Sequence, residues 1–399
     1  MQRLPLSRLV LLPLLVLSAC SSGQSPSSSG GAGGVGGTGG NGAAAGSAAA
    51  AGTMSGGAAG ASGSAATGGS SGAASGGTSS GGTGGVDPYA DLYVDDLTLP
   101  AASTAPFAVP DGTEFYSDIP YGTDPRMRFD LFKPTSAAPT PIVIFIHGGG
   151  FTGGSKDQYG NSDGIRSLLS AGVAYASLEY RVLDEVDSDG VIKCLSDNRR
   201  ALKFIRYHAS DLNLDAAKVV LRGGSAGAGT SLWLGFHDDM ARPDAESPVE
   251  HESTRVLGVI ANSTQATYDL LKWQTVVFAP YNLDLVQVTE ALGMEQRLLS
   301  FYGMQSIDDL PTPAITAYRA DVDMLALMSS DDPPFWVHNT LPEEVPATVG
   351  SLYHHPYHAR ALMDRATEVG VVSVGYIDAL NVADPSGESE WEFALRQLQ

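Results

Sequence analysis

Basic residues, cysteines and long apolar runs are all scarce in this sequence. Its 399 residues include 44 Asp and Glu but 23 Lys and Arg. All the acidic residues follow residue 86, whereas Arg3 and Arg8 precede it, so residues 87–399 hold 21 basic against 44 acidic side chains, a formal charge of −23. A domain this acidic repels nucleic acid and anionic lipid headgroups. The composition therefore argues against nucleic-acid binding and against flat binding to a membrane.

The first twenty residues have the pattern of a secretory signal. Two arginines precede an apolar run at 9–17 that is too short to span a bilayer, and the letters LSAC end at Cys20. The small residues before Cys20 resemble a bacterial lipobox, which predicts cleavage before Cys20 and a lipid on its thiol and new amino group. Ser21 favours passage to the outer membrane, so we expect a lipid-anchored protein of the bacterial cell envelope, or a secreted one. An ordinary signal peptide with an incidental cysteine is the alternative.

The second cysteine, Cys194, has no partner if Cys20 carries a lipid, so no intrachain disulfide is expected. It lies near the start of a predicted helix at 192–209, whose apolar residues recur at helical spacing. We therefore interpret Cys194 as a core-side residue and not as a nucleophile.

Residues 21–86 lack charged and aromatic side chains and consist almost entirely of Gly, Ala, Ser and Thr. Such a segment cannot bury enough apolar surface to offset its conformational entropy, so we expect disorder. A flexible chain of this length and composition has a root-mean-square reach on the order of 45 Å. The segment is thus predicted to be a linker that holds the domain at 87–399 away from a membrane surface.

Strand and helix patterns alternate through most of the domain at 87–399, after two opening strands. Alternation of this kind predicts an α/β fold with a mainly parallel sheet, right-handed crossovers and a site at the carboxyl ends of the strands. An aromatic-rich region at 262–330 interrupts it, and we expect a lid or pocket wall there, or helices that only pack. The expected strands are 114–121, 126–133, 142–146, 173–178, 219–221, 256–261, 334–338 and 371–377.

The segment KVVLRGGSAGAG contains a pattern that suits a nucleophilic serine. A short β-branched run ends in Gly223-Gly224-Ser225-Ala226-Gly227, and small helix-compatible residues follow. A serine on a sharp strand-to-helix turn needs uncrowded neighbours, which glycine on both sides supplies, and the helix directs its free N–H groups toward the serine. Ser225 is the candidate nucleophile. A glycine-lined helix entry without chemistry is the alternative.

A second motif, PIVIFIHGGGF, lies about 75 residues upstream. Its apolar run is typical of a strand buried on both faces, and it ends in His147, Gly148, Gly149 and Gly150. Three glycines after a strand let backbone N–H groups turn toward a ligand. We expect the amides of Gly149, Gly150 and Ala226 to form an oxyanion hole.

With both motifs in this order, the chain resembles the α/β-hydrolase fold, and within it the carboxylesterases related to hormone-sensitive lipase and the feruloyl-esterase-like group. The similarity covers about residues 129–235 and includes SLEYRV, CLSDNRRALKFIRYHA and LNLDAAKVVLRGGSAGAG. The resemblance implies a mainly parallel central sheet flanked by helices, with a helical insertion before the penultimate strand. It also implies hydrolysis of carboxylic esters without a cofactor or metal.

The sequence departs from that family where the acid and the base of the triad belong. In the loop HNTLPEEVP the slot of the aspartate falls on Pro342, so Glu343 and Glu344 become the candidate acids. The usual slot of the histidine falls on Asn381, and no histidine follows His358.

Two histidines upstream of that slot are the candidates for a replacement base. His354 and His355 belong to the cluster YHHPYH, where Pro356 is well placed to open a helix. Either of the two histidines would reach Ser225 from a different loop. Local hydrogen bonding or substrate contact, and metal binding, are the alternative roles of this cluster.

These observations predict a secreted, membrane-tethered serine hydrolase of carboxylic esters. Small-molecule esters and acyl esters linked to polysaccharides are the candidate substrates. A hydrolase fold that has lost its base and now binds a ligand is the competing hypothesis, and a peptidase of the same fold is a less favoured one. The oligomeric state stays open.

Overall fold

The structure is a computed structural model that describes residues 87–399. The predicted signal segment, the lipidation of Cys20 and the linker at 21–86 lie outside the described residues. In the described part of the chain, none of the helices combines the length and the apolar character that crossing a membrane requires.

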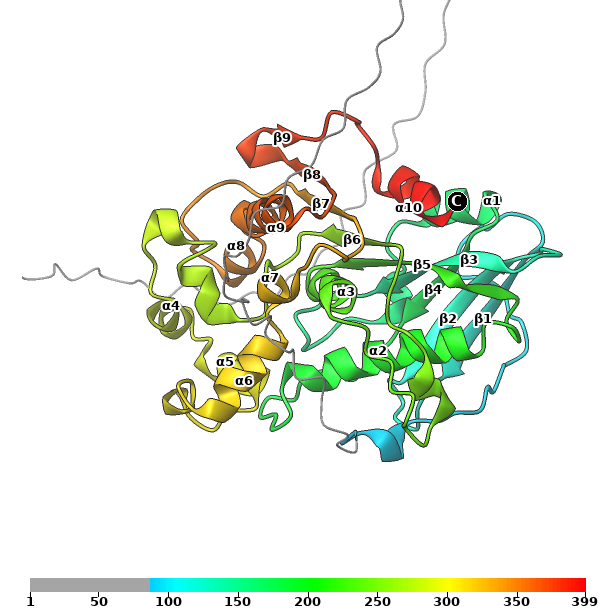
Figure 1. Cartoon of the computed structure of the whole chain (residues 1–399), viewed down its shortest axis with the longest axis horizontal. Helices are drawn as coiled ribbons and strands as arrows, with labels where there is room; N and C mark the ends of the chain where they lie inside the picture. Colours follow the sequence, from blue (N-terminus) through cyan, green and yellow to red (C-terminus); the bar gives the residue numbers. More distant parts are fainter. Residues whose placement is uncertain (1–86) are drawn as a thin grey trace, which may run out of the picture. The chain divides into compact units, whose positions relative to one another are not determined.

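One nine-stranded sheet organises the domain (Figure 1), in the order β1-β2-β4-β3-β5-β6-β7-β8-β9. The strands from β4 to β8 pair in parallel, whereas β1, β2 and β9 pair antiparallel. The predicted parallel sheet with antiparallel opening strands is confirmed. The strands are β1 (Thr113–Pro120), β2 (Arg128–Pro134), β3 (Thr140–Ile146), β4 (Ala174–Leu178), β5 (Leu214–Gly224), β6 (Gly258–Asn262), β7 (Phe335–Asn339), β8 (Ser373–Ile377) and β9 (Val382–Ala383).

Successive residues of the central strands face opposite sides of the sheet and enter different cores. In β5, Val219 and Leu221 belong to one buried cluster and Val220 to the other. Helices α1 (Ser162–Ser170) and α10 (Glu390–Leu398) pack on the side of Val220, while α2 (Val191–Tyr207), α3 (Ala226–Phe236) and α9 (Pro356–Val369) pack on the other. Burial on both faces explains the continuous apolar runs of the sequence.

Two details of the sheet differ from the predicted elements. The strand predicted at 219–221 is β5, which begins earlier, at Leu214, and the apolar pattern marks only part of its continuously buried stretch at 219–223. The short strand β9 was missed. After β8 the chain makes a 3₁₀ turn at Asp378–Leu380, and Asn381 in the left-handed conformation (φ 52°) leads into β9.

The region between β6 and β7 forms a set of short helices, as its aromatic-rich sequence indicated. Its longer members are α4 (Leu285–Ala291), α5 (Glu295–Tyr302), α6 (Pro313–Asp321) and α7 (Met324–Leu327), and a 3₁₀ segment at Leu270–Gln274 precedes them. Tyr268 of this insertion donates a hydrogen bond to the carbonyl of Ala226 at 2.7 Å, at the start of α3. The insertion therefore packs beside the carboxyl end of β5, and its role as a lid stays a prediction. In α2, Cys194 is fully buried, as expected for a core-side residue.

Candidate active site

Ser225 occupies a strained turn between β5 and α3. Its backbone has φ 54° and ψ −121°, a conformation that a residue with a side chain rarely adopts. A Cβ on Gly227 would lie 2.0 Å from the carbonyl oxygen of Ile146, and one on Gly223 would lie 2.2 Å from the backbone of Gly227. Glycine at both positions is thus required for β3, β5 and α3 to meet at this turn, and the turn presents the hydroxyl of Ser225 beyond the sheet.

The structure brings His354 to Ser225. The distance between Ser225 Oγ and His354 Nε2 is 2.7 Å, which is a hydrogen bond. His354 follows α8 (Val349–Tyr353), and the side-chain amide of Asn339 donates to its carbonyl at 2.8 Å. Burial lowers the pKa of His354, so the neutral ring at neutral pH can accept the serine proton. The pair therefore has the geometry of a nucleophile and its general base.

His355, the other candidate base, points elsewhere. Its Nδ1 accepts a hydrogen bond from the amide of Tyr357 at 3.2 Å, and its Nε2 contacts the carbonyl of Glu344 at 3.0 Å. These bonds make His355 the N-cap of α9 and leave neither ring nitrogen for Ser225. The structure therefore does not bring His355 to Ser225 as a base, because two consecutive residues at a helix entry project in different directions.

The two predicted acids do not orient His354 either. The carboxylate of Glu343 accepts a hydrogen bond from the hydroxyl of Tyr357, and Glu344 contributes its backbone carbonyl to His355. Within residues 87–399 no carboxylate is hydrogen-bonded to His354. The site is a serine–histidine pair in which Asn339 holds the backbone of the histidine. Sequence reasoning missed Asn339, although it occupies the end of β7, directly before the loop that bears the acid in the resembling family.

The glycine loop after β3 lies against the serine turn. A Cβ on Gly148 would meet the carbonyl oxygen of Gly224 at 2.7 Å and the Cβ of Ser225 at 3.1 Å. Within the described residues, the amides of Gly149, Gly150 and Ala226 donate no hydrogen bond. Uncommitted N–H groups beside a serine hydroxyl are what an oxyanion hole requires.

His147 anchors that loop in the core. Its ring is fully buried, stacks on Tyr180 at a centroid distance of 4.3 Å, and places Nε2 3.0 Å from Glu179 Oε1. Burial raises the pKa of Glu179, but the hydrogen bond with His147 and the charge of Arg126 lower it by more, so its pKa lies below the ordinary value. An ionised carboxylate therefore holds the histidine whose neighbours form the loop, and His147 itself does not face Ser225.

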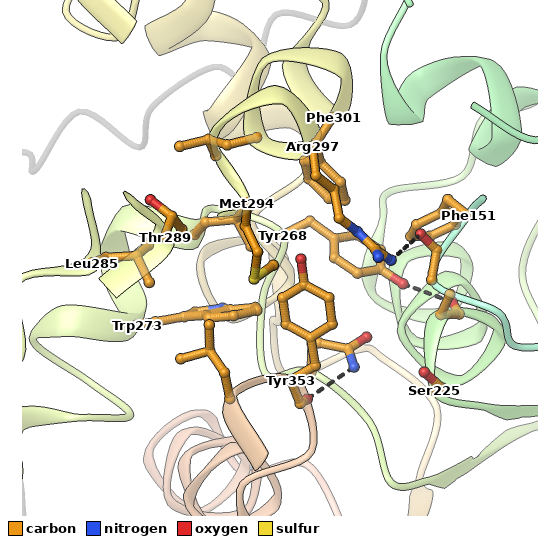
Figure 2. A pocket seen from close by; sticks show the side chains of 16 residues that line it. Phe151, Ser225, Tyr268, Trp273, Leu285, Thr289, Met294, Arg297, Phe301 and Tyr353 are labelled. Carbon is orange, nitrogen blue, oxygen red and sulfur yellow. Dashed lines mark hydrogen bonds between the residues drawn. The ribbon is translucent and has the colours of Figure 1, made fainter. Parts of the chain in front are cut away.

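A largely apolar cavity extends from Ser225 under the insertion (Figure 2). Its volume is about 560 Å³ when the part that opens to solvent is included. Tyr353, Trp273 and Met294 face its interior, and Arg297 reaches toward the glycine loop. Sequence reasoning assigned a pocket wall to this region without naming these residues. The lining residues are Gly150, Phe151, Ser225, Ala226, Gln265, Tyr268, Leu270, Trp273, Leu285, Thr289, Met294, Arg297, Leu298, Phe301, Leu352 and Tyr353.

A metal role for the histidine cluster does not fit the structure. His354 contacts Ser225, His355 caps α9, and His358 bonds the backbone of Ala266 and Leu352, so the three rings have separate partners. Among residues 87–399, no group of three or more histidine, cysteine or carboxylate side chains is placed to hold a metal ion.

A family model and several known esterases are similar in sequence to parts of this chain. Residues 129–296 match the family model BD-FAE. Gut esterase 1 of Caenorhabditis elegans is 30% identical over 114 residues, which are 27% of this chain and 20% of that protein. The probable isoprenylcysteine alpha-carbonyl methylesterase ICMEL2 of Arabidopsis thaliana is 31% identical over 130 residues, 32% of this chain and 30% of that protein. The chain thus spans about a fifth to a third of the length of these relatives.

Two solved structures share the fold. A truncated carbohydrate esterase from gut microbiota superposes with a TM-score of 0.52 at 14% identity, covering 75% of this chain and 99% of that one. A bifunctional GH43-CE protein of Bacteroides eggerthii gives 0.50 at 18% identity, covering 71% of this chain and 38% of that one. The domain at 87–399 therefore has the α/β-hydrolase fold that the two glycine motifs predicted, and its residues 129–296 match the BD-FAE family model.

Proposed function

We propose that this domain hydrolyses carboxylic esters through an acyl intermediate on Ser225. The hydrogen bond of 2.7 Å between Ser225 Oγ and His354 Nε2 carries the proposal, because it pairs a hydroxyl with a neutral imidazole at the entrance of a cavity. The esterases among the relatives and neighbours support the same reaction class.

In the first half of the reaction, Ser225 Oγ bonds to the ester carbonyl carbon while its proton passes to His354 Nε2. The carbonyl oxygen becomes an oxyanion, and the amides of Gly149, Gly150 and Ala226 donate to it. The C–O bond to the alcohol then breaks, and the alcohol leaves with the proton from His354. In the second half, water loses a proton to His354, attacks the acyl carbon and releases the acid, and the proton returns to Ser225.

The imidazolium formed in both halves has no carboxylate partner among residues 87–399. A buried imidazolium without a counter-charge is costly, which is consistent with the lowered pKa of His354. Proton transfer to this histidine is therefore less favourable than in a triad with an ionised acid, and the same feature favours the alternative, a catalytically impaired protein that binds its ligand.

Reactivity with a fluorophosphonate probe, together with turnover of short-chain aryl esters, tests the proposal. We expect labelling and turnover in the wild type and the loss of both in Ser225→Ala. His354→Ala should lower turnover about as much as Ser225→Ala does, because a positioned base contributes roughly 10² to 10⁴ in rate and the two groups act as a unit. His251→Ala is the matched control, since its exposed ring contacts only the carbonyl of Ala245 in the described structure. Folded wild-type protein that shows neither labelling nor turnover would contradict the proposed hydrolysis and favour the binding alternative.

We further propose acyl esters linked to polysaccharides as substrates and a lipid on Cys20 as the attachment to the bacterial cell envelope. The first is supported by the structural neighbour named a carbohydrate esterase. The second is supported by the letters LSAC after a short apolar run.

A further inference from the structure

We propose that Arg297 makes the cavity selective for esters that carry a carboxylate, an inference that rests on the proposed ester hydrolysis. Arg297 lies in α5 of the insertion and lines the cavity together with Ser225. Its position, its missing counter-charge and its apolar surroundings lead to the same conclusion.

The counter-charge is the first observation. The insertion holds three basic residues, Lys272, Arg297 and Arg319. Arg319 pairs with Asp269 at 2.8 Å and Lys272 pairs with Asp323. Arg297 forms no ion pair with any carboxylate of residues 87–399. It is therefore the basic group of the insertion that the described structure leaves without an anion.

The hydrogen bonds of the guanidinium are the second observation. Nη2 donates to the carbonyl of Gly150 at 3.0 Å, and the group lies 5.2 Å from the centre of the Tyr353 ring. A guanidinium has five N–H donors in a planar fork that matches a carboxylate. The bond to Gly150 uses one donor, and the contact with the face of Tyr353 uses none of the others. The remaining donors are available to a ligand.

The surroundings strengthen such a contact. Phe151 and Phe301 line the cavity beside Arg297, and its other walls are largely apolar. Charged groups interact more strongly where apolar walls exclude water than in bulk solvent. The negative charge of the domain opposes the approach of an anion at long range, so selectivity has to arise from contact inside the cavity.

The two residues that Arg297 contacts adjoin the proposed catalytic groups in the sequence. Gly150, which accepts its hydrogen bond, belongs to the predicted oxyanion loop, and Tyr353, over which it lies, directly precedes His354. A carboxylate on Arg297 would therefore belong to an ester whose carbonyl lies at Ser225. Two substrate chemistries meet this requirement: an acyl group that is the half-acid of a dicarboxylic acid, and an alcohol that bears an acid, as an acidic sugar does.

Matched pairs of esters distinguish these two sources. The acyl pair is the 4-nitrophenyl monoester of adipic acid against 4-nitrophenyl hexanoate. The alcohol pair is 4-carboxyphenyl hexanoate against 4-carbamoylphenyl hexanoate. For each pair the ratio of kcat/KM, anionic over neutral, is measured in wild type, Arg297→Lys and Arg297→Met, with spontaneous hydrolysis subtracted. A general loss of activity caused by breaking the hydrogen bond to Gly150 affects both esters of a pair and cancels in their ratio.

We expect one pair to show a ratio that falls about tenfold to hundredfold in Arg297→Met, the range for losing a hydrogen bond to a charged group. The ratio for Arg297→Lys should lie between those of the wild type and Arg297→Met, because lysine keeps the positive charge but lacks the planar fork of donors. The control is Arg360→Met, since Arg360 is an exposed arginine that pairs with Asp364 at 2.8 Å outside the cavity, and its ratios should equal those of the wild type.

Binding of adipate monomethyl ester to Ser225→Ala, measured by calorimetry with and without Arg297→Met, gives a readout without turnover. If neutral esters are hydrolysed and the kcat/KM ratios of both pairs are the same with and without Arg297, the inference is overturned and the proposed ester hydrolysis is kept. An inactive wild type with Arg297-dependent binding would overturn the hydrolysis and support the carboxylate site. Inactivity together with no Arg297-dependent binding would overturn both.

Discussion

Acidification should destabilise the segment that carries His354, and His358 is the group responsible. His358 is fully buried, its Nδ1 accepts from the amide of Ala266 at 3.2 Å, and its Nε2 donates to the carbonyl of Leu352 at 3.0 Å. A backbone amide can only donate, so these partners accept one tautomer of the neutral ring. Protonation would place an N–H against the amide of Ala266 and break the contact beside the site.

The magnitude follows from the pKa of His358. Burial, together with the nearby rings of His355 and His354, lowers it from an ordinary value near 6.5 to about 3, although the bond to Leu352 opposes the shift. The unfolded chain therefore binds a proton between pH 6.5 and 3 that the folded chain excludes, so stability is present above pH 6.5 and is lost as pH falls. One such group costs about 1.4 kcal/mol between pH 7.5 and 5.5 and roughly 2.6 kcal/mol by pH 4.5.

Urea unfolding at pH 7.5, 5.5 and 4.5 measures this effect by comparing the wild type with His358→Gln. The glutamine keeps a donor for Leu352 but does not titrate, so the wild type should lose about 1.4 kcal/mol more than the variant between pH 7.5 and 5.5. All other titrating groups are common to both proteins and cancel in this difference. His251→Gln, at an exposed histidine, should follow the wild type. Equal losses in wild type and His358→Gln would refute the reasoning.

Three further predictions concern the serine turn, the base and the N-terminus. Gly227→Ala should cost about 1–3 kcal/mol in urea unfolding and abolish turnover, because its Cβ would meet the carbonyl of Ile146 at 2.0 Å; Gly224→Ala, whose Cβ would meet nothing within 4 Å, is the matched control. Since burial lowers the pKa of His354 and only its neutral form accepts a proton, the acid limb of kcat/KM should lie below pH 6.5, and a midpoint above 6.5 would contradict this assignment. Cys20→Ala should move the protein from the membrane fraction to the soluble fraction without changing its melting temperature. Unchanged membrane association would contradict the proposal that Cys20 carries a lipid anchor.

The parts of the fold that could be predicted depend on short stretches of sequence. Apolar runs locate β3, β4 and β5 because burial on both faces excludes polar residues, and glycines around Ser225 are required by close backbone contacts, of Gly223 with Gly227 and of Gly227 with the end of β3. The pattern underestimates the length of β5, whose residues 215–218 are partly or fully exposed, and it misses β9, which has two residues. The local sequence pattern thus predicts buried strands and tight turns well, but it predicts strand pairing at exposed positions poorly.

The base and the selectivity of the site depend on directions that a sequence does not contain. His354 and His355 are equivalent in the pattern, yet one follows the last turn of α8 and the other caps α9, so their rings diverge. Glu343 and Glu344 are near the base in sequence, but Tyr357 and His355 take their hydrogen bonds. Arg297 enters the cavity only through the packing of α5 on the glycine loop, a long-range contact that no motif marks.

The turn between β8 and β9 has consequences for engineering and for divergence among related proteins. Both members of the proposed catalytic pair precede β8, and Asn381, at the position where the resembling family carries its histidine, ends a tight turn. Asp378 and Asn381 at this tip are exposed, whereas Leu380 packs on the core, and exposed positions of a tip with no part in the reaction tolerate changes. This tip is therefore a suitable place to attach a fluorophore or fuse a carbohydrate-binding module, and relatives with the same displaced histidine should differ most freely here.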